Sequence, residues 1–520
     1  MSSNNTEDLT GRDRMSVNVL ASWAGYLVFV MAGFVIPRMI DRHIGQVSLG
    51  IWDFSWSLVN YLNLSNLGIG SAVNRYVAMY RARGDVDSLR KTVSTVVVIQ
   101  LVIALFVAFG TVSLVWALPF FFYGRLEGEI DVASWVLGLL GMSLAVQMAL
   151  NPYRGVMTGL HRWDLHNAIH AGHRLATAFA MIISLEFGGG LVSLAFIYFL
   201  ATMAFEILRV IMANRVCAEL RIRPEYVEWS YGKKMFLFGV KTIVAGMPSL
   251  VVAQTGSVLI AASLGPAALA VFSRPMALVR TVETFISRFT FVLTPSAGAM
   301  QGSGRSDELR QFFLDTTRYG VAFTLPLLLL LAIDGDIILQ IWMGINYAQG
   351  QVVLVLALGF LLPISQSSVM RILMGMNLHG RIGLISLLIS IIVFCLGAFI
   401  VDAAGWSLAS VAALTGASLT VANGIVVPIY ACGRLHVSIK DYVIASFAVP
   451  MACAVPYSIC LILGRVIYPH SAFAALGFGS ALGALVLGAL YWKSMLPEKF
   501  REKLKAKISK ARFALKEPFC

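Results

Sequence analysis

Apolar residues are grouped along the chain in runs of about 20, separated by short polar or Gly/Pro-containing breaks. A helix rises 1.5 Å per residue, so a run of about 20 residues crosses the ~30 Å hydrocarbon core of a bilayer. Backbone amides in lipid must hydrogen-bond within the segment, which favours helices. The ten-residue alternation of a membrane β-barrel is absent from the sequence. The pattern therefore predicts an all-α, polytopic membrane protein.

About fourteen runs can be delimited in this way. Their approximate limits are 16–36, 48–70, 93–117, 133–151, 168–186, 191–212, 238–260, 268–298, 317–333, 350–371, 382–401, 405–430, 441–463 and 472–492. Ser16 to Ile36 is long enough to span a bilayer and no small-residue cleavage site follows it. We therefore expect a retained first helix rather than a cleaved signal peptide.

Composition and charge agree with this pattern. Only 13% of the residues are charged, about half the share of an average soluble protein. The net charge of +13 could indicate nucleic-acid binding. However, most Lys and Arg residues fall on one side of the membrane if the N-terminus is cytoplasmic. The sequence thus predicts that both termini are cytoplasmic.

The basic segment 493–520 places Phe500, Leu504, Ile508 and Leu515 on one helical face. This pattern is typical of a helix that lies on anionic phospholipids of the cytoplasmic leaflet, although a solvated basic tail has a similar composition. The six cysteines are scattered without a close Cys-x-x-Cys pair, so we expect neither a disulfide nor a metal site.

The two halves of the chain resemble each other. The matches at a shift of 220 residues are Gly45/Gly265, Leu49/Leu269, Gly84/Gly304, Asp87/Asp307, Leu89/Leu309 and Arg90/Arg310. Arg154 matches Arg371 at a shift of 217, and His161 matches His379 at 218. The shift covers six runs, an even number, so the two copies have the same orientation in the membrane.

We therefore expect two six-helix lobes in parallel repeat, followed by two extra C-terminal helices. The predicted parts are a cytoplasmic N-terminal tail (1–15), an N-lobe (16–212), a cytoplasmic linker (213–237), a C-lobe (238–430), helices 13 and 14 (431–492) and a basic amphipathic cytoplasmic tail (493–520). Two lobes around a central cavity are typical of alternating-access transporters, and a catalyst has no need of this duplication.

The first 90 residues carry a family resemblance. Its residues are Ile36-Pro37-Arg38, Ile44-Gly45, Leu49-Gly50, the run from Leu67 to Ala72, Arg75 to Ala78, Gly84-Asp85 and Leu89. These residues resemble the start of the Wzx-like polysaccharide and oligosaccharide flippases, a branch of the MOP superfamily to which the MATE transporters also belong. Many members of that branch have twelve spans, and fourteen spans are also similar to the lipid II flippases.

The resemblance implies a MATE-like fold and the translocation of an oligosaccharide linked to undecaprenyl pyrophosphate, from the cytoplasmic to the outer leaflet. It also implies the bacterial inner membrane, a role in cell-surface polysaccharide biosynthesis, and possible contact with the polymerase and assembly machinery. The sequence contains no nucleotide-binding loop, so we expect no cofactor and transport driven by a gradient or by substrate asymmetry.

Charged residues inside the predicted spans are the candidates for substrate binding, because charge in hydrocarbon is costly. The eighth span carries Arg274, Arg280, Glu283 and Arg288, with the three arginines on roughly one half of the helix. Its repeat partner, the second span, carries Asp53, Ser55, Ser57, Asn60, Asn63 and Asn66. Guanidinium groups match phosphate oxygens, and Asn and Ser side chains suit sugar hydroxyls.

An alternative for the eighth span is structural: Arg280 and Glu283 would form an i,i+3 ion pair, and Arg288 would extend to the cytoplasmic interface. If the anion-binding interpretation is correct, the double substitution Arg274→Ala and Arg280→Ala abolishes glycan export and leaves membrane insertion intact.

A second group of candidates lies on the cytoplasmic approach to the fifth span. His166, His170 and His173 share one helical face, flanked by Arg162 and Arg174. We considered a zinc site, an entry path for pyrophosphate and an ordinary interfacial helix, of which the last is the commonest. Arg75 and Lys241 are similar. We interpret them mainly as anchors at the cytoplasmic face, and only secondarily as residues that contact the ligand.

Two other functions have to be compared with the flippase. A multidrug–cation antiporter of the same superfamily often has an acidic residue in its first helix, which 16–36 lacks, and the arginines of the eighth span would repel cations. A membrane-embedded glycan polymerase or ligase needs an acid/base or metal site. Asp334 and Asp336 are the residues to consider for it, but two acids at the end of a helix are more often solvated.

Overall fold

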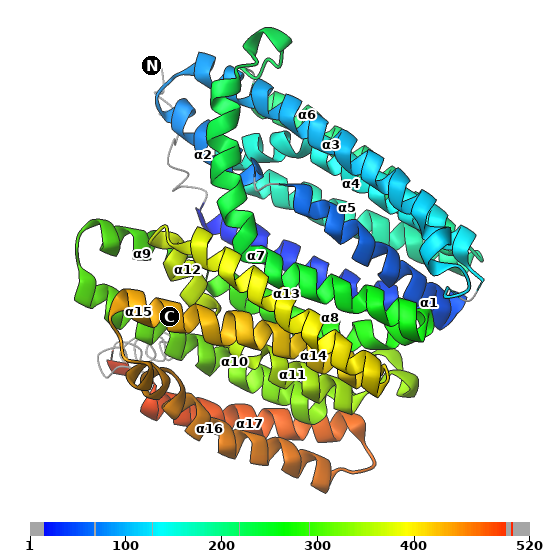
Figure 1. Ribbon diagram of the computed structural model, residues 1–520, viewed down its shortest axis with the longest axis vertical. Helices are drawn as coiled ribbons and strands as arrows, with labels where there is room; N and C mark the ends of the chain where they lie inside the picture. Colours follow the sequence, from blue (N-terminus) through cyan, green and yellow to red (C-terminus); the bar gives the residue numbers. More distant parts are fainter. Residues whose placement is uncertain are drawn as a thin grey trace, which may run out of the picture. The chain divides into compact units, whose positions relative to one another are not determined.

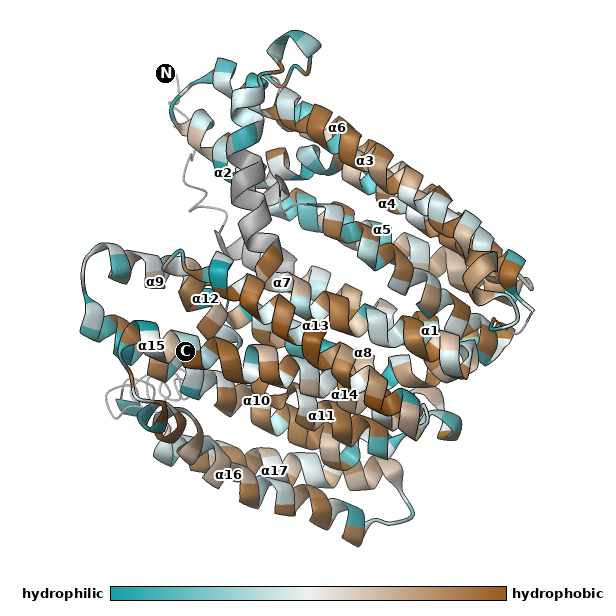
Figure 2. Cartoon of the chain, viewed as in Figure 1, coloured by the Kyte–Doolittle hydropathy of each residue, from teal (hydrophilic) through white to brown (hydrophobic). Residues whose placement is uncertain are grey.

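The computed structural model describes residues 15–66, 69–126, 128–217, 219–290, 292–495 and 501–502, with side chains outside 15–22, 69–72 and 234–243. These residues form helices and their connections and no β-strand (Figure 1). Figure 2 shows hydrophobic residues along the long helices and hydrophilic residues around their connections. Within the described part, twelve helices are long and apolar enough to cross a membrane. The chain is therefore an all-α, multi-pass membrane protein.

The fourteen predicted spans correspond to these twelve helices and two further segments. Helix α1 (Met15–Leu62) is one of the twelve helices, but it contains the first two predicted spans, which are joined at a kink at Gly45. Helix α8 (Pro266–Thr290) is not among the twelve, and its four charged residues lower its hydropathy. The predicted number of spans thus agrees with the structure.

The remaining helices follow in chain order. They are α2 (Ile69–Ala82), α3 (Val86–Phe122), α4 (Ile130–Gly159), α5 (Trp163–Glu186), α6 (Leu191–Val216), α7 (Trp229–Leu264), α9 (Leu293–Gly302), α10 (Ser306–Met343), α11 (Gly350–Ser365), α12 (Ser367–Gly375), α13 (His379–Ala404), α14 (Leu408–Leu419), α15 (Val427–Leu435), α16 (Ile439–Ile467) and α17 (Ala472–Ser494). Residues Thr420–Val426, between α14 and α15, form a π-helix.

Two predicted spans extend too far. The second ends at Leu62 rather than 70 and continues as the short 3₁₀ helix Asn63–Asn66, because Asn and Ser side chains compete for backbone hydrogen bonds. The eighth ends at Thr290, and α9 follows as a separate helix with Pro295 in its first turn, where proline is tolerated.

The backbone confirms the internal repeat. Gly45 has φ 89° and ψ 169°, and its sequence match Gly265 has φ 87° and ψ 170°. Gly84 and Gly304 share a positive φ of 67° and 70°. Only glycine adopts the conformation of Gly45 and Gly265 readily, because other residues lack this region of φ/ψ space. Two copies of one backbone therefore bend at the same place.

The element boundaries also refine the repeat register. Helices α4 and α12 end at Gly159 and Gly375, a shift of 216 rather than the 217 to 218 taken from the sequence. Accordingly, His161 corresponds to Asn377, since both have positive φ, of 56° and 58°. The match of His161 with His379 was wrong by two residues, because the positive-φ position after the helix sets the register, not the residue type.

Equivalent hydrogen bonds close each repeat. The Nε of Arg90 in α3 donates to the carbonyl of Glu219, 2.9 Å away. The Nε of Arg310 in α10 donates to the carbonyl of Leu435, 2.8 Å away. In each copy, therefore, the start of the third span is bound to the chain at the end of the sixth.

The structure divides into two compact units. The first is Met1–Arg274 with His379–Ala422, and the second is Pro275–Leu378 with Asn423–Cys520. These units differ from the repeat halves, because their boundaries lie inside α8, before α13 and within the π-helix. The lobe limits predicted above stay a prediction.

Within the first unit, α3 packs on α4, α4 on α6 and α1 on α5 (Figure 1). The outer face of α3 is apolar and open: Leu105, Phe109 and Trp116 are each more than 70% exposed. In a membrane-spanning helix such a face contacts lipid. In the second unit, α16 and α17 pack through small residues, and a Cβ on Gly464 would lie 2.5 Å from the carbonyl oxygen of Ala475.

We expect Gly45→Ala and Gly265→Ala to destabilise the protein by similar amounts, about 1–3 kcal/mol each, because both force a side chain into a glycine-only conformation. Thermal unfolding in detergent measures the effect. Gly433→Ala is the matched control, since Gly433 lies in a regular helix and its added Cβ would meet nothing within 4 Å. A wild-type melting temperature for either repeat variant would contradict the prediction.

Candidate functional site

Arg274 and Asp53, two predicted site residues, form a buried ion pair. The Nη2 of Arg274 lies 2.5 Å from the Oδ2 of Asp53, and the Arg274 side chain is 5% exposed. Arg274 comes from α8 and Asp53 from the segment of α1 after the kink, so repeat-related segments supply the two partners. The carboxylate compensates the charge of this arginine within the first unit.

Arg280 and Glu283, in the second unit, form the i,i+3 ion pair that the structural alternative expected. Their Nη1 and Oε2 atoms are 2.8 Å apart, and both side chains are about one-third exposed. The guanidinium of Arg280 also lies over the ring of Phe360, 5.8 Å from its centroid. Arg288, in the last turn of α8, is exposed. Arg274 and Arg280 are thus each paired with a carboxylate.

The polar residues predicted to face α8 differ in their burial and in their hydrogen-bond partners. Asn60 and Asn63 are half-buried, and Ser55 is fully buried. The hydroxyl of Ser57 donates to the carbonyl of Asp53 in its own helix, 2.9 Å away. Asn66 accepts a hydrogen bond from the amide of Asn151 in α4 at 3.1 Å. Asn60 and Asn63 stay the candidates for sugar hydroxyls.

The three histidines lie on α5, which is itself one of the membrane-spanning helices. His166 is buried, and His170 and His173 are half-buried. The ring centroids of His166 and His170 are 6.3 Å apart, and the Nε2 of His173 lies 3.3 Å from the Oγ1 of Thr202 in α6. Arg174 lies eleven residues after the start of α5, so the stripe reaches ~16 Å along the helix.

Arg209 and Glu206 on α6 were missed by the sequence analysis. The Nη1 of Arg209 lies 2.6 Å and 2.8 Å from the two carboxylate oxygens of Glu206, and both side chains are buried. Arg154 of α4 interacts electrostatically with both of them. The signal was available, because Glu206 and Arg209 lie three residues apart inside a predicted span.

Together these side chains form a group that we call the α4–α6 cluster: Arg154, Arg174, Glu206 and Arg209 with the three histidines of α5. It holds three guanidinium groups and one carboxylate, so its arginines exceed its acids by two charges. Arg154 is exposed and Arg174 half-buried, so both can reach a ligand. A net positive charge within membrane-spanning helices favours an anion.

Arg371 gives the second repeat an arginine like Arg154. It lies on α12, four residues before Gly375, and Arg154 lies on α4, five residues before Gly159. The side chain of Arg371 is half-buried. Both copies of the repeat therefore place an arginine about one turn from the end of the fourth span.

Asp334 and Asp336 are not the pair of solvated acids that the sequence suggested. Asp334 is 1% exposed, and its Oδ1 lies 3.8 Å from the Nε of Arg465 on α16. The Nη2 of Arg465 lies 2.5 Å from the Oδ2 of Asp336. Helix α10 continues to Met343, so Asp334 lies inside the helix and not at its end. Arg465 is thus an ion-pair partner of both carboxylates.

The remaining predicted residues are less informative. Arg75 is exposed on α2. Lys241 belongs to α7, but its side chain lies outside the described residues, as does the predicted amphipathic helix from residue 503 onwards. Among the residues that the structure describes, no group of three His, Cys, Asp or Glu side chains is arranged to hold a metal ion.

Comparison with known proteins gives both a sequence family and a fold. A family model described as polysaccharide biosynthesis protein matches residues 62–352, more than half of the chain. No curated protein matches the chain significantly in sequence.

Several solved structures share the fold. An inward-facing multidrug resistance MATE family transporter of the MOP superfamily has a TM-score of 0.62 at 13% identity, covering 81% of this chain and 94% of its own. The lipid II flippase MurJ in an inward closed conformation has a TM-score of 0.63 at 12% identity, covering 92% and 100%. A MOP superfamily transporter from Pyrococcus furiosus has 0.61 at 13%, covering 82% and 96%.

Proposed function

The chain belongs to the polysaccharide biosynthesis protein family, and from this premise we propose that it is a flippase of the MOP type. Its cargo would be an oligosaccharide linked through pyrophosphate to a polyprenol of the undecaprenyl type. The protein would move this lipid from the cytoplasmic to the outer leaflet by alternating access, for cell-surface polysaccharide biosynthesis, without catalysing a reaction.

The observation that carries this proposal is the excess positive charge of the α4–α6 cluster. A guanidinium group is planar and binds two phosphate oxygens at once, so pyrophosphate is a fitting ligand for neighbouring arginines. The cluster lies next to the connection 160–162, which the predicted topology places on the cytoplasmic side, where a lipid-linked glycan is assembled. The cluster is thus suited to receive the head group on entry.

The predicted cavity residues would act later in the same path. Arg280 is one-third exposed beside Glu283, so a phosphate can displace the carboxylate as its partner. Arg288 is exposed on the same helix, and Asn60 and Asn63 offer amides for sugar hydroxyls. Arg274, by contrast, is enclosed with Asp53 and has a structural role in this proposal.

A lipid II flippase is the second candidate. The solved lipid II flippase covers 92% of this chain, compared with 81% for the multidrug transporter. A multidrug–cation antiporter is disfavoured, because the net positive α4–α6 cluster repels cationic drugs. A glycan polymerase or ligase is disfavoured, because Arg465 pairs with both Asp334 and Asp336.

The family resemblance further supports location in the bacterial inner membrane, and the distribution of Lys and Arg supports cytoplasmic termini. Anionic phospholipids would surround the basic cytoplasmic surface, and the polysaccharide polymerase or assembly machinery would receive the product. No nucleic acid, metal or cofactor is part of the proposal.

Depletion of the protein in its host tests the function. We expect undecaprenyl-linked glycan to accumulate on the cytoplasmic leaflet, because assembly continues while export stops. Mass spectrometry of extracted lipids identifies the accumulated glycan and separates lipid II from a polysaccharide unit. Unchanged surface polysaccharide and no accumulated intermediate would contradict a flippase role.

A further inference from the structure

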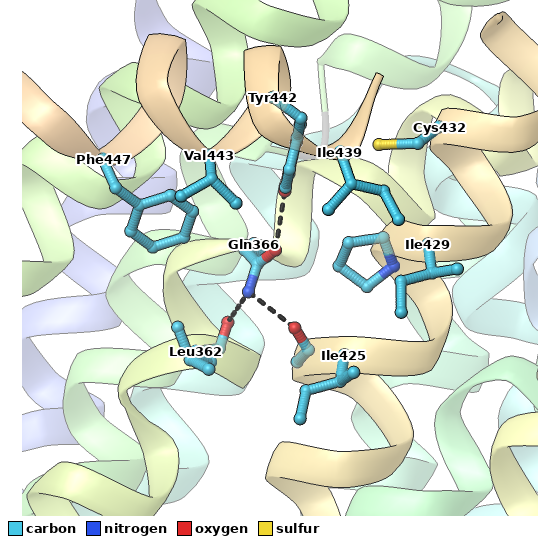
Figure 3. A pocket seen from close by; sticks show the side chains of 11 residues that line it. Leu362, Gln366, Ile425, Ile429, Cys432, Ile439, Tyr442, Val443 and Phe447 are labelled. Atoms are coloured by element: carbon cyan, nitrogen blue, oxygen red, sulfur yellow. Dashed lines mark hydrogen bonds between the residues drawn. The ribbon is translucent and has the colours of Figure 1, made fainter. Parts of the chain in front are cut away.

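A cavity of about 280 Å³ lies within the second unit, between α11, the π-helix with α15, and the start of α16. Figure 3 shows its lining, in which aliphatic and aromatic side chains predominate. Gln366 is at the centre of this view, between Tyr442 on one side and Leu362 on the other. Neither the α4–α6 cluster nor the residues of α8 contribute to this cavity.

The polar groups of the cavity are already satisfied by one another. The hydroxyl of Tyr442 donates to the Oε1 of Gln366 at 2.6 Å. The Nε2 of Gln366 donates to the carbonyls of Gly424 at 2.9 Å and Leu362 at 3.3 Å. Both side chains are buried. The polar side chains of Tyr442 and Gln366 therefore need no hydrogen bond from a ligand. A hydrocarbon chain is the ligand that such a lining favours.

The mouth of the cavity is apolar as well. It is bordered by side chains that face each other across two helices and are each about half exposed: Ile425 at 41%, Ile429 at 47%, Ile439 at 53% and Val443 at 48%. In membrane-spanning helices such residues contact lipid. The cavity thus opens sideways to the acyl chains of the bilayer.

Charge lies at one end of this mouth. The turn that joins α15 to α16 is cytoplasmic in the predicted topology, and Arg434, His436 and Lys440 are exposed there. Asp441 is the acid at this end, and it accepts a hydrogen bond from the Ser438 hydroxyl at 2.7 Å. Arg434 and Lys440 outnumber Asp441, and the neighbouring Arg310 is paired with Asp307, so the balance of charge favours an anionic head group at the membrane surface.

We propose that this cavity binds one acyl chain of an anionic phospholipid from the cytoplasmic leaflet, with the head group at Arg434 and Lys440. The volume equals that of about nine groups of ~30 Å³, the liquid volume of a water molecule and close to that of a methylene. That is a large part of one phospholipid chain and a small part of a 55-carbon polyprenol. The site is separate from the proposed transport path and does not depend on the cargo.

Occupancy would affect the π-helix directly. Gln366 holds the carbonyl of Gly424, and Ile425 lines the mouth, so the lipid packs against the segment Thr420–Val426. The chain passes from one compact unit to the other inside this segment, between Ala422 and Asn423. Filling the void is expected to stabilise the π-helix, because an empty apolar cavity is costly.

The purified full-length protein tests the proposal by thermal unfolding in detergent with added phosphatidylglycerol or phosphatidylcholine. We expect phosphatidylglycerol to raise the melting temperature by several degrees and phosphatidylcholine to raise it less. Val443→Trp, which fills the mouth, should remove the increment. Ile444→Trp is the matched control, because Ile444 is a similarly exposed neighbour outside the cavity lining.

The head group is tested by the double variant Arg434→Gln and Lys440→Gln, which should lose the preference for phosphatidylglycerol. Arg83→Gln, an exposed arginine elsewhere on the predicted cytoplasmic face, should keep it. Equal effects of the two lipids on the wild type, or equal increments in the Val443 and Ile444 variants, would overturn the proposal.

A second measurement does not depend on variants that fold poorly. Phosphatidylglycerol with a photoreactive group in its acyl chain should crosslink the wild-type protein at residues 424–447, with competition by unlabelled phosphatidylglycerol. Competition by undecaprenyl phosphate alone would overturn the proposal in favour of the polyprenol. Because no glycan is used, these outcomes are independent of the proposed transport function.

Discussion

Replacing Arg154 and Arg174 together with alanine is expected to abolish glycan export while the protein still folds and inserts into the membrane. Arg154 is exposed and Arg174 half-buried, and among the described residues neither forms an ion pair with a carboxylate. A hydrogen bond to a charged group contributes about 1.5–3 kcal/mol, so losing two weakens pyrophosphate binding by roughly 100-fold or more. Export of surface polysaccharide in a depleted host measures the result.

Membrane levels and melting temperature must be compared in the same experiment, because a folding defect would also stop export. Arg83→Ala is the matched control: it removes an exposed arginine from the turn between α2 and α3, and we expect normal export. Arg154→Lys should retain part of the activity, since it keeps the charge and loses the two-pronged geometry. Normal export by the double variant at normal membrane levels would contradict the role of the α4–α6 cluster.

The second large effect is structural. Arg274→Ala is expected to destabilise the protein by about 3–5 kcal/mol, because it leaves the Asp53 carboxylate buried without its partner. The sequence alone predicts that a variant lacking Arg274 and Arg280 inserts normally and loses only transport. The ion pair changes that expectation for Arg274. Thermal unfolding and the amount of protein in the membrane fraction measure the loss.

Replacing both Asp53 and Arg274 with neutral residues distinguishes two causes of instability: an uncompensated buried charge and the loss of the contact itself. The double variant Asp53→Asn with Arg274→Gln should recover much of the stability, because no charge is left uncompensated. Arg280→Ala should cost less than Arg274→Ala, since the Arg280–Glu283 pair is about one-third exposed. A wild-type melting temperature for Arg274→Ala would show that the pair with Asp53 is dispensable.

Much of the fold could be read from the sequence because its causes are local. Span length follows from bilayer thickness, and the kinks at Gly45 and Gly265 require glycine in both copies of the repeat. Helix ends were less predictable. The second span stops at Leu62 because polar side chains after it compete for backbone hydrogen bonds, which apolar periodicity does not reveal.

The site was predictable only where partners lie on one helix. Arg280 and Glu283 are three residues apart, so their pairing follows from helix geometry. Arg274 and Asp53 are 221 residues apart, and their pairing depends on how α1 and α8 pack. Asp334 is similar, because its partner Arg465 comes from α16. The charge balance of the α4–α6 cluster likewise required three helices to be placed together.

The hydrogen bonds of Arg90 to Glu219 and of Arg310 to Leu435 bear on the origin of the molecule. In each hydrogen bond, the donor and the acceptor belong to the same six-span copy. Duplication of one gene leaves such a pair of equivalent bonds. Asp53 and Arg274 show where the two copies have since diverged, because their counterparts at the repeat shift of 220 are Ser273 and Phe54.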